Sequence, residues 1–167
     1  IMRIYTLEEL ELASEVFLER VQIYNPIQAS IYQNQINLGC RFNDVMKLEK
    51  WSIVNELTVS LLPQKNNSLR VFNKSDLDVM LRHQLENNYN LYSKTSYSDA
   101  ISVFFRMFPL PNIRVKNKPI KTHIFRHIKA KRLKANGMSD NDIRLYLGEN
   151  MQRSANDYIY SQVYTFE

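Results

Sequence analysis

The sequence has little cysteine and little glycine, and each shortage excludes a class of site. The single cysteine, Cys40, rules out an internal disulfide framework and a cysteine-rich zinc site. Three glycines are too few for either common glycine-rich loop that binds nucleotide phosphates. The chain must therefore be stabilised by packing, and the two common classes of nucleotide-binding enzyme are excluded.

Long apolar segments are also missing. No apolar run approaches the roughly 20 residues that a membrane span requires, and the N-terminus has no signal-peptide pattern. A chain of 167 residues with 44% apolar and 23% charged residues is long enough to bury an ordinary core. We therefore expect one globular domain over residues 1–167, in the cytoplasm and away from membranes.

Acidic residues are absent from residues 100–139, although the net charge of the chain is only +5. This stretch holds ten basic residues: Arg106, Arg114, Lys116, Lys118, Lys121, Arg126, Lys129, Lys131, Arg132 and Lys134. Such segregation is typical of a surface that binds nucleic acid. A solvated basic helix would explain a charge run alone equally well.

Hydrophobic periodicity and capping signals predict a mixed α+β domain that is mainly helical. We expect helices over 6–21, 26–37, from 41, 76–88, 98–107, 122–136, 139–148 and from 154. Short segments rich in Val, Leu and Ile at 53–56, 57–62 and 69–72 predict a small three-stranded antiparallel sheet.

The segment THIFRH places His123, Arg126 and His127 on one face of a predicted helix. They could be core or capping histidines beside a surface arginine. The two histidines could also bind a zinc ion together. No third ligand is evident nearby, however, and the ten basic residues would repel a doubly charged metal ion. The set suits an anion better, because a guanidinium grips phosphate at two points while an imidazole handles a proton.

Tyr158 follows Arg126 by 32 residues and is expected in the first turn of the last helix, whose free N–H groups favour a phosphate. A nearby arginine and base could activate its phenol as a nucleophile, although most tyrosines only pack. Tyr160 is a rival. Arg41 is expected at a helix start and Lys65 in a turn between strands.

The order Arg41, Lys65, His123 with Arg126, then Tyr158 resembles the catalytic domain of tyrosine recombinases, the phage integrase family. The resemblance covers most of the chain. The segments that resemble the family are NLGCRFNDVMKLEKWSIV for the first arginine box, VSLLPQKNNSLRVF for the strands with the turn lysine, THIFRHIKAKRLKANG for the HxxRH box, and IRLYLGENMQRSANDYIYS for the LGH box and nucleophile.

The resemblance implies a mainly helical fold around a small sheet and a strand-transfer reaction on DNA without metal, ATP or other cofactor. Tyr158 would attack a phosphodiester, forming a 3′-phosphotyrosyl bond and freeing a 5′-hydroxyl. Arg41 and Arg126 would hold the non-bridging oxygens. Lys65 would protonate the leaving oxygen, and His123 would assist removal of the phenol proton.

The same resemblance implies double-stranded DNA as partner, self-association into a tetramer on DNA, and a mobile element of prokaryotic or viral origin. The residues expected to bind DNA are Arg114, Lys116, Lys118, Lys121 and Lys129. The family's separate N-terminal DNA-binding domain is expected to be absent from residues 1–167.

Glu149 departs from the family, which usually has His or Trp after the LG pair. Its carboxylate could turn away, be protonated, or bond a cation such as Lys65 or an arginine. Two alternatives to a competent recombinase follow. One is a DNA-binding relative that has lost catalysis, and the other is a metal-dependent nuclease that uses Asp140, Asp142 and Glu149.

Overall fold

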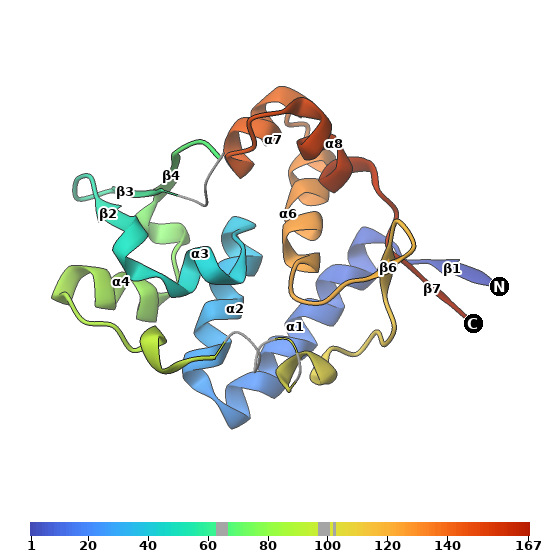
Figure 1. Cartoon of the computed structure of the whole chain (residues 1–167), viewed down its shortest axis with the longest axis horizontal. Coiled ribbons are helices and arrows are strands. Elements are labelled where there is room, and N and C mark those ends of the chain that lie inside the picture. Colours follow the sequence, from blue (N-terminus) through green and yellow to red (C-terminus); the bar gives the residue numbers. More distant parts are fainter. Residues whose placement is uncertain (63–66, 97–100, 102) are drawn as a thin grey trace.

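The computed structural model describes residues 1–62, 67–96, 101 and 103–167, and it has the mixed α+β, mainly helical architecture expected. Three helices, α1 (Leu7–Tyr24), α2 (Pro26–Leu38) and α6 (Ile124–Ala135), lie at the centre (Figure 1). A small sheet with α4 (Val79–Asn87) lies on one side of them. Two further helices, α7 (Asp140–Leu147) and α8 (Gln152–Tyr160), pack against α6.

The central helices begin where the sequence signals predict and are held by an aromatic core. Thr6 and Glu9 form a complete capping box at the start of α1, and Asn25 caps α2, whose first residue is Pro26. Phe17 of α1 is fully buried, and its ring contacts the four rings of Tyr32, Phe105, Phe108 and Phe125. This packing fixes the side of α6 that faces α7 and α8.

The predicted three-stranded antiparallel sheet is confirmed, with the order β2 (Trp51–Ile53), β3 (Thr58–Leu61), β4 (Arg70–Asn73). Its first strand begins earlier than the predicted 53–56. The reason is Trp51, which is buried and donates its indole N–H to the Asp44 carbonyl at 2.9 Å. Asp44 belongs to the short helix α3 (Phe42–Met46), which is joined to β2 by a 3₁₀ turn, η1 (Leu48–Lys50).

A second sheet was not predicted. Its order is β1 (Met2–Ile4), β7 (Tyr164–Phe166), β5 (Arg114–Val115), β6 (Lys118–Pro119), all antiparallel. It brings the chain ends together, and the amino group of Ile1 donates to the Glu167 carbonyl at 2.9 Å (Figure 1). Residues 116 and 117, between β5 and β6, both have positive φ, which is typical of a tight hairpin turn.

Some predicted boundaries are wrong, and one prediction falls partly outside the described residues. The last helix begins at Gln152 and not at Ser154, so Tyr158 lies in its second turn and not its first. Asp78 caps α4, so that helix begins after the predicted 76. Of the helix predicted at 98–107, the described end is a 3₁₀ turn, η4 (Phe104–Met107). Two more such turns are η2 (Lys74–Asp76) and η3 (Tyr92–Lys94).

Within the described part of the chain, no helix has the length and apolar character to cross a membrane.

Gly39 ends α2 in a left-handed conformation, with φ of 67°. A Cβ atom there would lie 3.1 Å from Cγ of Lys129, and the Gly39 carbonyl accepts a hydrogen bond from Arg126 at 2.8 Å. We expect Gly39→Ala to lower the free energy of unfolding by about 1 to 2 kcal/mol, because left-handed backbone strains a residue with a Cβ. Urea denaturation checks this, and a wild-type midpoint and slope would contradict it.

Candidate active site

Helix α6 carries the residues on which the site is built. His123 immediately precedes the helix and has no side-chain capping bond, so the prediction of Thr122 as cap is wrong. Arg126 and His127 follow in the first turn and are 1% and 5% exposed. The three side chains of the HxxRH segment lie together: the ring centroids of His123 and His127 are 6.0 Å apart, and both rings contact Tyr158, as does the Arg126 guanidinium.

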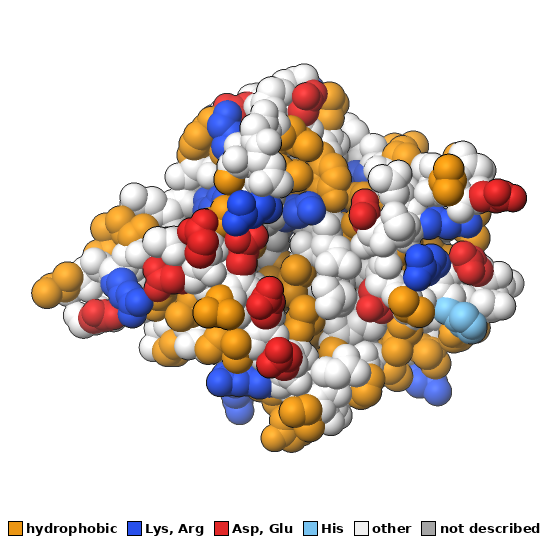
Figure 2. Space-filling model, turned by 180° about the vertical axis from the view of Figure 1, so that it is seen from behind, with side chains coloured by type: hydrophobic (Ala, Val, Ile, Leu, Met, Phe, Trp, Pro, Cys, Tyr) orange, Lys and Arg blue, Asp and Glu red, His pale blue; other side chains and the backbone are white. Residues whose placement is uncertain are grey.

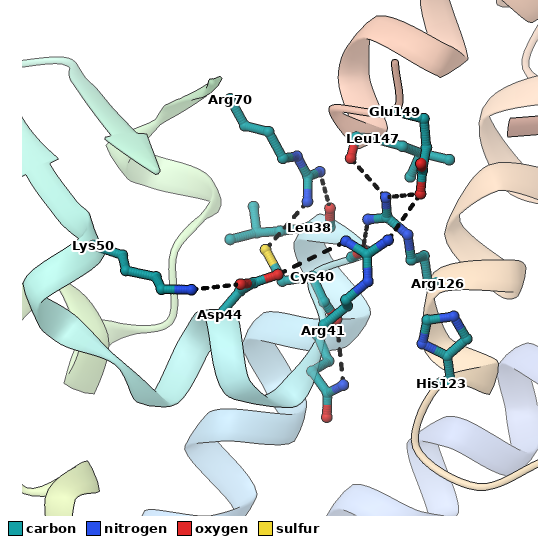
Figure 3. A network of polar contacts seen from close by, with 12 residues as sticks. Leu38, Cys40, Arg41, Asp44, Lys50, Arg70, His123, Arg126, Leu147 and Glu149 are labelled. Atoms are coloured by element: carbon teal, nitrogen blue, oxygen red, sulfur yellow. Dashed lines mark hydrogen bonds and ion pairs between the residues drawn. The ribbon is translucent and has the colours of Figure 1, made fainter. Parts of the chain in front are cut away.

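Arg126 is fixed by the ends of two helices. One terminal nitrogen donates to the carbonyl of Gly39 at the end of α2, and the other donates to Leu147, the last residue of α7, at 2.7 Å. That second nitrogen also contacts Oε1 of Glu149 at 2.8 Å (Figure 3). The carboxyl ends of helices carry partial negative charge, which favours a buried cation there. Nε of Arg126 is buried with no partner among the described residues.

Arg41 approaches the same carboxylate from the start of α3. Its Nη2 lies 2.9 Å from Oε1 of Glu149, and its Nη1 lies 3.8 Å from Oδ2 of Asp44 (Figure 3). Of the three arrangements left open for Glu149, the structure has the one in which it bonds arginines. Two guanidinium groups from segments 85 positions apart in the sequence therefore converge on one oxygen atom.

Glu149 is ionised at neutral pH because of these contacts. Burial alone would raise its pKa, but the hydrogen bond from Arg126 and the charges of Arg126 and Arg41 lower the pKa below its ordinary value. Gly148, in a left-handed conformation, ends α7 and turns the chain so that Glu149 follows directly. The backbone N–H and C=O of Glu149 both bond to Arg144, which holds the main chain at this position.

Tyr158 is hydrogen-bonded to a neutral histidine. Its hydroxyl lies 2.7 Å from Nε2 of His123. Burial, followed by the charges of Arg126 and Arg41, lowers the pKa of His123 to about 4, so the imidazole is uncharged at pH 7. A neutral imidazole has one acceptor nitrogen, and in the tautomer with the proton on Nδ1 it accepts the phenol proton of Tyr158.

The ring of Tyr158 packs against side chains of α6. The Arg126 guanidinium carbon lies 4.9 Å from the centre of its ring, and the His127 ring meets it edge-on at 4.8 Å. His127 is buried, and its pKa is lowered to about 3 by burial and then by the charge of Lys131. Nδ1 of His127 has no partner among the described residues.

Tyr160, the rival nucleophile, has a different environment. Its hydroxyl donates to the carboxylate of Asp140 at 2.7 Å, and the side chain is 57% exposed. Asp140 is also paired with Lys134. Of the two tyrosines, Tyr158 is therefore the one that contacts the histidines and Arg126.

Sequence reasoning missed the role of Lys131 at the end of α8. Its ammonium group donates to the carbonyls of Tyr158, Ile159 and Ser161 and so closes the carboxyl end of the helix that carries Tyr158. Burial lowers its pKa to about 8. The available signal was its spacing: Lys131 is four residues after His127 and hence on the same face of α6.

A cavity of about 550 Å³ joins these groups. The residues that line it include Arg41, His123, His127, Glu149 and Tyr158. The β5–β6 hairpin forms another part of its wall and contributes Lys116 and Lys118. The cavity is therefore open to solvent, with Arg41, the Tyr158 ring and two hairpin lysines at its wall. One of these lysines, Lys116, pairs with Asp157 at 3.1 Å.

The five residues expected to bind DNA do not all lie at this cavity. Lys116 and Lys118 line it, and Lys121, which follows β6, is exposed. Arg114 donates to the Asn117 carbonyl within the hairpin. Lys129 instead lines a second cavity, of about 610 Å³, next to α1 and α2.

The molecule as a whole is not uniformly basic. Seen from behind, Asp and Glu side chains lie next to Lys and Arg side chains over the middle of the surface (Figure 2). The acid-free run of residues 100–139 therefore has acidic neighbours from other segments. One example is the ion pair between Arg132 and Glu11 of α1.

The predicted lysine in the strand-connecting turn, Lys65, lies outside the described residues. Two of the three carboxylates of the nuclease alternative have other partners, since Asp140 pairs with Lys134 and Glu149 with the arginines. Among the residues that the structure describes, no three His, Cys, Asp or Glu side chains are grouped to hold a metal ion.

No protein-family model matches the chain, and no curated protein is significantly similar to it in sequence.

His123 and His127 make the stability of the folded chain depend on pH. Their folded pKa values, about 4 and about 3, lie below the ordinary value of 6.5. Between pH 6.5 and 4 the unfolded chain binds more protons, so stability is complete above pH 6.5 and falls as the pH drops. We expect a loss on the order of 2 kcal/mol per histidine between pH 7 and pH 5.

Urea denaturation of His127→Gln at both pH values tests this expectation. The variant should lose less stability on acidification than the wild type, because one of the two proton-binding differences is gone. His83→Gln is the matched control, since His83 is exposed. Equal pH dependence in His127→Gln and the wild type would contradict the expectation.

Proposed function

We propose that this chain is the catalytic domain of a site-specific DNA recombinase or integrase that cleaves and rejoins strands through a phosphotyrosyl intermediate. The observation that carries the proposal is that Tyr158, His123 and Arg41 line one cavity, while the buried Arg126 contacts both Tyr158 and Glu149. These residues come from three separate parts of the chain. Packing alone does not require a phenol, a neutral imidazole and two guanidinium groups at one place.

The chemistry of each group fits phosphoryl transfer. The Tyr158 oxygen would form a bond to phosphorus while the bond between phosphorus and the 5′ oxygen breaks. The phenol proton would pass to His123, to which the hydroxyl is already hydrogen-bonded. Arg41 and Arg126 would face the non-bridging oxygens, where negative charge grows in the transition state. The leaving 5′ oxygen needs a proton, a role that the family resemblance gives to Lys65.

The charges around His123 keep it able to accept a proton. Burial, and then the charges of Arg126 and Arg41, lower its pKa, and the Glu149 carboxylate opposes this effect. A phosphodiester anion beside the arginines would oppose it in the same way. The imidazole would thus be neutral at pH 7 when the phosphate arrives.

Duplex DNA is the proposed substrate because of the cations at the cavity. Lys116 and Lys118 project from the hairpin that lines it, where they would contact phosphates on either side of the scissile one. Binding should therefore weaken as salt concentration rises. Assembly into a tetramer on DNA is part of the same proposal.

A second candidate function is DNA binding without catalysis. It is favoured by one observation, the Glu149 carboxylate that bonds both arginines where the reaction would need a phosphate. A protein of this kind would bind DNA in a salt-sensitive manner and form no covalent adduct. The choice between the two functions depends on whether an adduct forms.

Tyr158→Phe is expected to abolish the covalent protein–DNA adduct on a nicked suicide substrate, because it removes the attacking oxygen. DNA binding, measured by gel shift, should be nearly unchanged. Tyr160→Phe is the matched control and should form wild-type amounts of adduct on a denaturing gel. An adduct that persists in Tyr158→Phe would reject Tyr158 as the nucleophile.

Arg41→Lys is expected to slow adduct formation on the order of 100-fold, since lysine keeps the charge but loses the planar pair of donors. Arg41 suits this test better than Arg126, which is 1% exposed and helps to hold the fold. Arg82→Lys, outside the residues that line the cavity, is the control. An unchanged rate of adduct formation in Arg41→Lys would contradict the proposed role.

A further inference from the structure

Glu149 holds the position between the two arginines with a single oxygen atom. Oε1 lies 2.9 Å from Nη2 of Arg41 and 2.8 Å from Nη2 of Arg126, and the residue is 7% exposed. Two guanidinium groups that meet at one anionic oxygen form the arrangement that also suits one oxygen of a tetrahedral anion. The carboxylate therefore occupies a place where an oxyanion ligand would fit.

The arginines have other contacts that would keep them in place if the carboxylate moved. Arg126 is bonded to the carbonyls of Gly39 and Leu147, and Arg41 lies near the buried carboxylate of Asp44. The two carbonyls belong to the ends of α2 and α7, and neither of these contacts involves Glu149. If Glu149 moved away, the two arginines would thus remain in place without the anion between them, which would favour binding of another anion.

The side chain of Glu149 has a cavity beside it, whereas its backbone is held on both sides. Arg144 binds both its N–H and its carbonyl, so the main chain is held on either side of the residue. The side chain, with three rotatable torsions, lines the cavity of about 550 Å³. Rotation into that space would release the arginine pair without any change in the helices.

We propose that Glu149 is an internal substitute for the phosphate, which neutralises the pair Arg41 and Arg126 in the free protein and is displaced when a tetrahedral oxyanion binds. This inference rests on the proposed function for the identity of the ligand, a DNA phosphodiester. The competition between carboxylate and oxyanion, in contrast, is a property of the site itself. It can be measured without DNA.

Inorganic sulfate is the probe, added at constant ionic strength to wild type, Glu149→Gln and Glu56→Gln. Glu56 is exposed, so its replacement changes the net charge equally without touching the arginines. Thermal unfolding against sulfate concentration gives the dissociation constant, because a ligand that binds only the folded state stabilises it. We expect sulfate to bind Glu149→Gln at least tenfold more tightly than wild type or Glu56→Gln.

Arg41→Gln in the Glu149→Gln background identifies the site, and the gain in sulfate affinity should disappear in this double variant. Equal sulfate affinity in Glu149→Gln and Glu56→Gln would overturn the proposal, and so would weaker binding in Glu149→Gln, which would mean that the carboxylate organises the pair for the ligand. If Glu149→Gln does not fold, Glu149→Asp provides the same comparison, since its shorter side chain reaches the two arginines less well.

Adduct formation on the suicide DNA separates this inference from the proposed function. Tighter sulfate binding in Glu149→Gln together with faster adduct formation supports both. Tighter sulfate binding in Glu149→Gln with no adduct in any variant would support competition between Glu149 and an oxyanion, and it would reject the recombinase function. An adduct that forms in wild type, with no change in sulfate affinity or rate in Glu149→Gln, keeps the recombinase and rejects the role of Glu149.

Discussion

The guanidinium of Arg126 is the interaction on which the rest of the site depends. A cation that is 1% exposed must be compensated, because removing a charge from water without partners costs several kcal/mol. The compensation comes from the ends of two helices and from Glu149. Both helices end in glycines with positive φ, Gly39 and Gly148, so the chain reversals that present the acceptors need residues without a Cβ.

The same charge sets the chemistry of the groups around it. Arg126 lies over the ring of Tyr158 and, with Arg41, contributes to the low pKa of the histidine that contacts the Tyr158 hydroxyl. At neutral pH the site thus combines charged arginines with an uncharged imidazole. A phosphate-transfer site needs both kinds of group, since charged arginines bind the anion and an uncharged histidine accepts a proton.

Much of the fold was predictable because its signals are local. The capping box of Thr6 and Glu9, the proline that opens α2 and the Ser139 cap of α7 each lie within a few residues of the helix they start. The second sheet gave no such signal, because its strands have only two or three residues and its first strand, β1, pairs with β7 at the opposite end of the chain. Helix α8 begins at Gln152, and its N-cap residue Met151 forms no side-chain capping bond, so the prediction wrongly placed the start at Ser154.

The sequence predicted which residues form the site, but it did not predict the distances and contacts between them. The order of the motifs identified Arg41, His123, Arg126 and Tyr158, whereas their distances depend on how α2, α6 and α7 pack. Glu149 illustrates the limit: turning away, protonation and pairing are all compatible with its place in the sequence. What decides between them is that both arginines meet at the carboxyl end of α7, where residue 149 emerges. Two cations at one point of the interior require an anion, and without a ligand the chain itself must supply it.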